Sequence, residues 1–229
     1  MVDGEPVGGE WNYDEENRQF PGTDYDPPDP PRFEPDAVTR EVSEWVRGTF
    51  DGSYDEHPYG GAWADPEPFR WPVTREEALA ALASFCDDRL VEFGPYQDAM
   101  LGSEWAMNHA LLGAATNVGL LHPAEVIERV IEAAREDAEV PFSSLEGFVR
   151  QVLGWREFVR HVYRVEMPEL ATANRLDATE DLPELYWTGG TEMNCLSNVI
   201  DGVRERGYSH HIERLMVLSN FALLYGRSE

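Results

Sequence analysis

The amino-acid sequence predicts an all-α fold. Two Ser/Thr-x-x-Glu patterns, Thr74 with Glu77 and Ser143 with Glu146, are capping boxes typical of helix starts. Apolar residues recur at three- and four-residue spacings through most of the chain after residue 36, and we find neither strand alternation nor an internal repeat. The sequence therefore indicates a helical bundle preceded by an irregular arm.

The helices are predicted from caps, prolines, glycines and apolar stripes, in chain order. Asp36 can cap the first helix, Pro123 suits the first turn of another, and Gly207 suits a helix end. In the helix that begins near Pro123, we expect the buried stripe to be Val126, Val130, Ile131 and Ala134. The other predicted helices cover 37–49, 75–92 (with Gly94 as the stop), 103–119, 144–165, 191–207 and 209–225.

Two segments lack a helical pattern. Residues 1–35 contain few apolar residues and many Pro, Gly and Asp, which predicts an extended linker or wrapping arm. The aromatic residues of its segment 8–18, Trp11 and Tyr13, are expected to bury against other parts of the protein. Residues 51–72 are again irregular and rich in Pro and Gly. We therefore divide the chain into an arm, 1–35, and one helical domain, 36–229.

The last predicted helix, 209–225, is apolar on nearly all sides. Such a helix belongs in the centre of a larger bundle. Because the sequence ends four residues later, at Glu229, we expect the elements that cover this helix to be missing or to come from another chain.

The charge of the chain is strongly acidic. Asp and Glu number 44 against 18 basic residues, all of them arginine, and the net charge is −26 at pH 7. Such a surface suits a salty medium that screens its self-repulsion, so we interpret it as adaptation to a high-salt cytoplasm. The alternative, an acidic protein that mimics nucleic acid or binds a basic partner, requires charge on one face, whereas here it is spread along the chain.

This charge also argues against simple electrostatic binding of DNA. One local exception is a row of arginines at helical spacing, which could contact phosphates or pair with the many carboxylates: Arg150, Arg156, Arg160 and Arg164. Two cysteines make no disulfide framework, and the sequence has no signal peptide and no run of eighteen apolar residues. These features predict a soluble, cytoplasmic protein.

Several residues could carry chemistry, although each also has an ordinary structural explanation. His210 and His211 point about 100° apart on one helix, and Arg214 lies one turn beyond His210. They could meet a ligand, or they could be partly exposed residues of a capped first turn. Cys195 could be a buried structural thiol. Trp155 and Trp187 could be core residues, stacking surfaces or electron relays.

Longer motifs, taken in order along the chain, go beyond these single residues. The sequence closely resembles the prokaryotic photolyase-related family, which comprises the iron–sulfur cryptochromes and (6-4) photolyases. The resemblance runs through residues 8–18, 93–100, 117–121, 146–158 and 186–224. It implies a helical FAD-binding domain that repairs (6-4) photoproducts in UV-damaged DNA by light-driven electron transfer from reduced flavin.

The resemblance also implies roles for individual residues. Cys195 matches the first cysteine ligand of the family's [4Fe–4S] cluster, Trp187 matches a tryptophan of the electron path, and Trp155 would stack on the lesion. His210 and His211 match the histidine pair thought to donate and accept a proton during repair. By looser similarity, the residues lining the FAD pocket would be Tyr96, Arg156, Tyr208, His211 and Arg214.

The sequence departs from the family pattern in three respects. Residues 109–114 replace a run that usually contacts the FAD phosphates, and both of its hydroxyls are lost. The family's antenna domain and the other three cluster cysteines also have no counterpart here. Three hypotheses follow: a photolyase fragment completed by a separate chain and inactive alone, a cryptochrome-like flavin photoreceptor, or a cofactor-free helical remnant acting as an interaction module.

Overall fold

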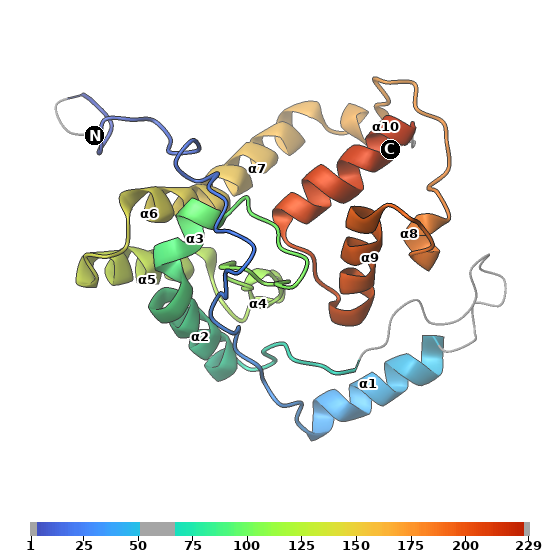
Figure 1. Ribbon diagram of the computed structural model, residues 1–229, viewed down its shortest axis with the longest axis horizontal. Helices are drawn as coiled ribbons and strands as arrows, with labels where there is room; N and C mark the ends of the chain where they lie inside the picture. Colours follow the sequence, from blue (N-terminus) through green and yellow to red (C-terminus); the bar gives the residue numbers. More distant parts are fainter. Residues whose placement is uncertain (1–3, 51–66, 227–229) are drawn as a thin grey trace. The chain divides into compact units, whose positions relative to one another are not determined.

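The computed structural model describes residues 4–50 and 67–226, and the described part is helical. No β-strand occurs among these residues, and Leu101 and Glu104 form an isolated bridge. The all-α prediction is therefore confirmed (Figure 1). The chain divides into two compact units. The first unit comprises Pro72–Ala171 and the described residues before Arg32; the second comprises the described residues of Arg32–Trp71 and those from Thr172 onward.

The first helix of the first unit is α2, Arg75–Ser84, which starts at the predicted capping box. Thr74 Oγ1 accepts a hydrogen bond from the Glu77 backbone N–H at 3.2 Å. A π turn, Phe85–Arg89, and α3, Leu90–Tyr96, follow directly. The prediction that Gly94 stops the helix is therefore wrong, because α3 continues past it to Tyr96. The absence of a side chain at Gly94 instead lets Ser144 approach the helix closely.

The predicted helix 103–119 is wrong. Only α4, Gly113–Asn117, is helical there, and the preceding residues form turns and loops. Met107 and Leu111 have φ values of 45° and 59°, which a right-handed helix cannot contain. Ala106 and Met107 are buried, so core packing overrides the local helical preference of this segment.

The helix predicted to begin at Pro123 is α5, Pro123–Glu136. The ring of His122 caps its start, since Nδ1 accepts from the Ala124 backbone N–H at 3.2 Å. Two of the four residues of the predicted stripe are fully buried, and Ile131 and Ala134 are half-buried. The buried stripe is Val126, Val130 and Ala133.

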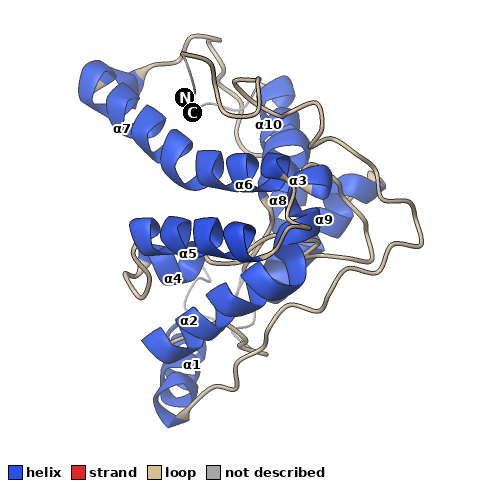
Figure 2. Cartoon of the chain, turned by 90° about the vertical axis from the view of Figure 1, so that its left-hand side faces the viewer, coloured by secondary structure: helices blue, strands red, loops and turns tan. Residues whose placement is uncertain are grey.

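The next helical run consists of α6, Phe142–Val149, a π turn, Arg150–Gly154, and α7, Trp155–Glu166. This run confirms the helix predicted over 144–165. It begins directly after Pro141, so the prediction that Ser143 and Glu146 form a capping box is wrong. Figure 2 shows α6 leading into α7, and α5 contacts both α6 and the π turn. No residue of α7 is buried, whereas α6 buries one side against α3. A short 3₁₀ turn, Glu169–Thr172, follows α7.

The core of the first unit contains a cluster of three phenylalanines from α6 and from the run of α2 and α3. The ring centroids of Phe85 and Phe148 lie 4.8 Å apart, and Phe93 meets them edge-on at 5.7 and 5.5 Å. Such aromatic contacts each contribute about 0.5–1.5 kcal/mol beyond the burial of their surface. This cluster fixes α3 against α6.

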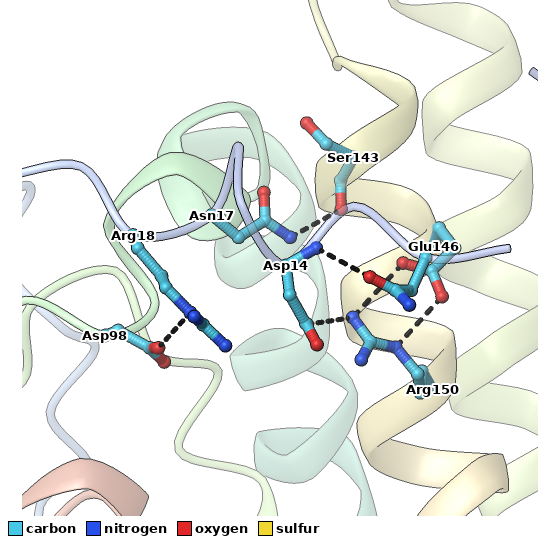
Figure 3. A network of polar contacts seen from close by, with 8 residues as sticks. Asp14, Asn17, Arg18, Asp98, Ser143, Glu146 and Arg150 are labelled. Carbon is cyan, nitrogen blue, oxygen red and sulfur yellow. Dashed lines mark hydrogen bonds and ion pairs between the residues drawn. The ribbon is translucent and has the colours of Figure 1, made fainter. Parts of the chain in front are cut away.

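The arm before residue 32 is pinned to the first unit by polar contacts (Figure 3). Arg150 contacts Asp14 of the arm at 2.6 Å and Glu146, one turn earlier on its own helix, at 2.9 Å. Fully buried Asn17 donates from Nδ2 to the Ser143 carbonyl at 3.1 Å. Farther along the arm, the Gln19 backbone N–H donates to the Pro95 carbonyl at 2.9 Å. These contacts hold an arm that has little apolar surface of its own.

The aromatic residues of the arm behave differently from one another. Tyr13 is half-buried and meets Phe142 edge-on at 5.4 Å, as expected. Trp11 is 74% exposed, so the expectation that it buries is wrong for this residue within the described chain. The division into arm 1–35 and domain 36–229 stays a prediction. The irregular stretch 51–72 falls mostly outside the described residues.

The second unit contains α1, Ala37–Phe50; α8, Leu185–Thr188; α9, Asn194–Arg206; a π turn, Glu213–Ser219; and α10, Asn220–Tyr225. Asp36 caps α1 as predicted, its Oδ1 accepting from the Thr39 backbone N–H at 2.7 Å. The helix predicted over 191–207, which Thr191 was expected to cap, instead begins at Asn194 as α9, with Met193 at its N-cap. Gly207 ends α9 with a φ of 63°, as predicted. The final helical run exposes many apolar side chains, including Leu215, Met216, Leu223 and Leu224.

Candidate functional site

The segment from Tyr208 to Arg214 joins α9 to the final helical run in the second unit. The turn at Gly207 brings Tyr208 against Trp71, with ring centroids 5.7 Å apart. Trp71 is fixed in turn, because its Nε1–H donates to the Arg206 carbonyl at 3.3 Å. The start of the histidine segment is thus held by an aromatic pair and by the end of α9.

The two histidines lie in opposite environments. His210 is 1% exposed, whereas His211 is exposed, and so is Arg214. Burial, with smaller contributions from the charges of His211 and Arg214, lowers the pKa of His210 to about 4. His210 is therefore neutral near pH 7, while His211 is exposed to solvent. His210 lies just before the helical run, which begins at His211, so the predicted placement of both histidines on one helix does not describe the pair.

The Glu213 side chain contacts both Ser209 and His210 at the start of the final helical run. One carboxylate oxygen accepts from the Ser209 hydroxyl at 2.8 Å and from the His210 backbone N–H at 3.3 Å. The other oxygen lies 3.5 Å from His210 Nε2. Burial raises the pKa of Glu213, opposed by these hydrogen bonds and by the charge of Arg206. Sequence reasoning missed this residue, although a Glu three residues after a helix-start residue is a usable signal.

Cys195 and Trp187 also lie in the second unit. Cys195 is exposed in the first turn of α9, so the structural-thiol interpretation does not describe its position here. Trp187 is half-buried in α8. That short helix is held to the final helical run, because the Tyr186 hydroxyl donates to the Leu218 carbonyl at 2.5 Å and its ring lies 6.3 Å from Phe221.

The remaining predicted site residues, Tyr96, Trp155 and Arg156, belong to the first unit. Tyr96 ends α3, and its ring meets Tyr25 of the arm edge-on at 5.1 Å. Trp155 is 51% exposed beside Phe158, with ring centroids 5.8 Å apart, so it is not a core residue here. Arg156 is exposed on the same helix.

The arginine row 150–164 is not uniform. Arg150 pairs with Asp14 and Glu146, and Arg160 pairs with Glu157 at 3.1 Å. For these two arginines the structure therefore favours pairing with carboxylates. Arg156 and Arg164 point from exposed positions on α7.

An iron–sulfur cluster does not fit this chain by itself. A [4Fe–4S] cluster takes four cysteine thiolates, and the sequence contains two cysteines. Burial raises the pKa of the Cys86 thiol to about 11, which disfavours the thiolate a metal needs. Within residues 4–50 and 67–226, no group of three or more His, Cys, Asp or Glu is arranged to hold a metal ion. Within the same ranges, no helix has the length and apolar character required to cross a membrane.

Comparisons with known proteins agree with this fold. Residues 1–59 match the family described as deoxyribodipyrimidine photo-lyase-related protein. The chain is 41% identical over 227 residues to a (6-4) photolyase of Agrobacterium fabrum, covering 99% of this chain and 43% of that protein. It is also 25% identical over 114 residues to an uncharacterized protein of Acanthamoeba polyphaga mimivirus, covering 50% of this chain and 87% of that protein.

A solved structure shows the same fold. A bacterial class III photolyase from Agrobacterium tumefaciens superimposes with a TM-score of 0.59 at 20% sequence identity. The match covers 73% of this chain and 34% of that one, so the present sequence spans less than half the length of the photolyases it matches. The helical fold and the similarity along nearly the whole sequence show that this chain belongs to the deoxyribodipyrimidine photolyase-related family.

Proposed function

We propose that this chain forms part of a flavin-dependent protein that repairs (6-4) photoproducts in UV-damaged DNA with light. The observation that carries the proposal is the unequal histidine pair: a buried, neutral His210 beside an exposed His211. Repair of a lesion by proton exchange needs one group that accepts and one that donates near neutral pH. The 41% identity to a (6-4) photolyase supports the same role.

The other residues take the roles that photolyase chemistry requires. Trp155 presents an exposed ring on which an extruded base can stack. Arg156 and Arg164 lie on the same exposed helix and can contact phosphates in an otherwise acidic protein. Trp187 would pass electrons toward the flavin. Each of these assignments is a proposal that rests on exposure and on the relationship to photolyases.

The residues proposed for FAD fit it in part. His211 and Arg214 are exposed in the second unit and offer N–H donors to an anion, and Tyr208 offers an aromatic ring beside Trp71. Residues 109–114 offer only backbone groups to the phosphates, since the hydroxyls are lost. FAD bound here would supply the light-driven electron transfer.

A second polypeptide is part of the proposal. Cys195 would ligate a [4Fe–4S] cluster, but three further thiolates must come from elsewhere, because Cys86 is buried in the core. The exposed apolar side chains of α7 and α10 provide surface for such a partner to cover. We infer that the chain alone does not repair DNA and that a completing chain restores activity.

Absorbance of the purified protein in molar salt tests the flavin part of the proposal. The blue and near-ultraviolet bands of oxidised flavin should appear after incubation with FAD and should weaken in Arg214→Gln. Arg175→Gln, an exposed arginine in the same unit, is the matched control and should leave the bands unchanged. A protein that stays colourless contradicts flavin binding and leaves the cofactor-free interaction module.

Repair is tested separately with an oligonucleotide that carries a (6-4) photoproduct. Illumination of the flavin-loaded protein, with any completing chain added, should restore the intact bases, and His211→Asn should abolish this. Bound flavin without repair in the completed protein would instead favour the photoreceptor hypothesis.

A further inference from the structure

We propose that Glu213 is a positioning residue: it orients the His210 ring and holds it in the neutral tautomer whose hydrogen is on Nε2. The consequence for DNA repair rests on the proposed function above. The orientation and the tautomer do not, because the contacts that favour them lie within one short segment of the second unit.

The geometry places a carboxylate oxygen opposite one ring nitrogen of His210, at a contact longer than a hydrogen bond. Glu213 Oε1 lies 3.5 Å from Nε2, and the two side chains are 15% and 1% exposed. A carboxylate accepts hydrogen bonds and does not donate them, so it favours the ring form that carries a hydrogen on the facing nitrogen. In that ring form Nδ1 carries the lone pair.

The same carboxylate is fixed on its other side. Glu213 Oε2 accepts from the Ser209 hydroxyl at 2.8 Å and from the His210 backbone N–H at 3.3 Å. Both donors favour the ionised carboxylate over the protonated acid. Because Glu213 binds the backbone of His210 and also faces its ring, rotation of the ring is coupled to the start of the helix.

The charged groups around this pair act in a consistent direction. His211 and Arg214 disfavour a positive charge on the His210 ring, and Arg206 favours the negative charge on Glu213. The balance keeps a neutral ring beside an anion. This arrangement separates the two histidines: the His210 ring is held neutral in one orientation, and His211 stays exposed to solvent.

A purely structural role for Glu213 is the alternative, since a side chain at this position also caps the helix start. Glu213→Gln separates the two roles, because glutamine can still accept from Ser209 and from the backbone but presents no charge. Its amide can also turn an N–H group toward the ring. Capping would therefore survive, whereas the preference for hydrogen on Nε2 would not.

The test is ¹⁵N–¹H correlation of the imidazole rings in the chain as it exists, without flavin. The wild-type His210 ring should show hydrogen on Nε2, and Glu213→Gln should shift it toward the Nδ1–H form with unchanged helical circular dichroism. Glu192→Gln, an exposed glutamate of the same unit, should leave the His210 signals in place. Hydrogen on Nδ1 in the wild type, or the same tautomer in Glu213→Gln, overturns the proposal.

A second variant covers the case in which Glu213→Gln does not fold. Ser209→Ala keeps the carboxylate but removes one of its anchoring hydrogen bonds, so the minor tautomer should rise about fivefold, the ratio that about 1 kcal/mol gives. An unchanged tautomer ratio in a folded Ser209→Ala protein contradicts the proposed positioning.

Repair provides the final readout in the completed, flavin-loaded protein. Glu213→Gln should slow repair at least about tenfold with unchanged affinity for damaged DNA, since proton transfer by a positioned group contributes at least that much. An Nε2–H tautomer in a protein that never repairs DNA would contradict the proposed function alone. Repair at the wild-type rate in Glu213→Gln would contradict the positioning role alone.

Discussion

Replacing Asp14 with asparagine removes one charge from the contact that holds the N-terminal arm against α6. Arg150 bridges Asp14 and Glu146, and the Asp14 and Arg150 side chains are 35% and 29% exposed. An exposed ion pair contributes about 0.2–1 kcal/mol, and breaking a buried one costs about 3–5 kcal/mol. Because solvent reaches both groups, we expect Asp14→Asn to weaken docking of the arm by an amount near the lower of these ranges, about 1 kcal/mol. This corresponds to roughly a fivefold increase in the population of molecules whose arm is undocked.

The pH dependence has a definite sign. The Arg150 guanidinium lowers the pKa of Asp14, so the unfolded chain takes up a proton before the folded one does. The stabilisation is complete above the ordinary range of the carboxyl group and is lost as the pH falls through the lowered pKa. Asp14→Asn should therefore lose stability relative to wild type at neutral pH and approach it in acid.

Limited trypsin digestion reports on arm docking, because the chain contains no lysine and Arg18 lies within the docked arm. The bond after Arg18 is flanked by buried Asn17 and by Gln19, whose backbone N–H donates to Pro95, so cleavage requires local release. Asp14→Asn should accelerate this cleavage about fivefold in dilute buffer, and the difference should shrink in 1 M salt, where the Debye length is about 3 Å. Asp24→Asn, an exposed carboxylate on the same arm, is the matched control. Equal cleavage rates in Asp14→Asn and wild type at low salt would refute the reasoning.

Two further predictions concern packing and the histidine pair. Gly94→Ala would place a Cβ 2.7 Å from Ser144 Cα and should lower the free energy of unfolding by about 1–3 kcal/mol in urea titrations. In the control variant Gly113→Ala, the added Cβ meets nothing within 4 Å, so the effect should be nearly neutral. Equal urea midpoints for the two variants would show that α3 and α6 are not in close contact. His210 has a folded pKa of about 4 against an ordinary 6.5, so the unfolded chain binds the proton first and stability should fall by roughly 3 kcal/mol as the pH drops between these values. His210→Gln should flatten that slope in thermal or urea unfolding across pH 4–7, and an unchanged slope would show that His210 is not buried in its neutral form.

The sequence predicted the helices best where the helix ends are determined by local chemistry. Asp36, the Thr74–Glu77 box and Gly207 all act as their residue types suggest, because a cap depends on atoms only a few residues away. The prediction was wrong where a distant segment decides the conformation. Gly94 looked like a stop but serves the close approach of Ser144, and buried residues around Met107 prevent a helix that the local sequence favours.

The candidate site shows the same limit. Adjacent histidines on a helix predict two different directions, but not which ring is buried, since that depends on what packs around the helix. Glu213 could have been noticed as a capping residue, yet its approach to the His210 ring follows from tertiary burial. The exposure of Cys195 and Trp155 could not be predicted either, because the ordinary fate of both residue types is burial.

The π turn at Arg150–Gly154 changes the phase of the helix that carries Trp155. On an uninterrupted α-helix, the buried stripe of α6, which includes Ser144 and Phe148, would continue through Trp155 and Phe158. A π turn accommodates one extra residue, which rotates every later side chain by about 100° about the axis. The aromatic residues of α7 are thereby turned out of line with the interior that α6 fills. Removing a single residue from this turn would restore the alignment and turn the exposed ring of Trp155 toward the interior.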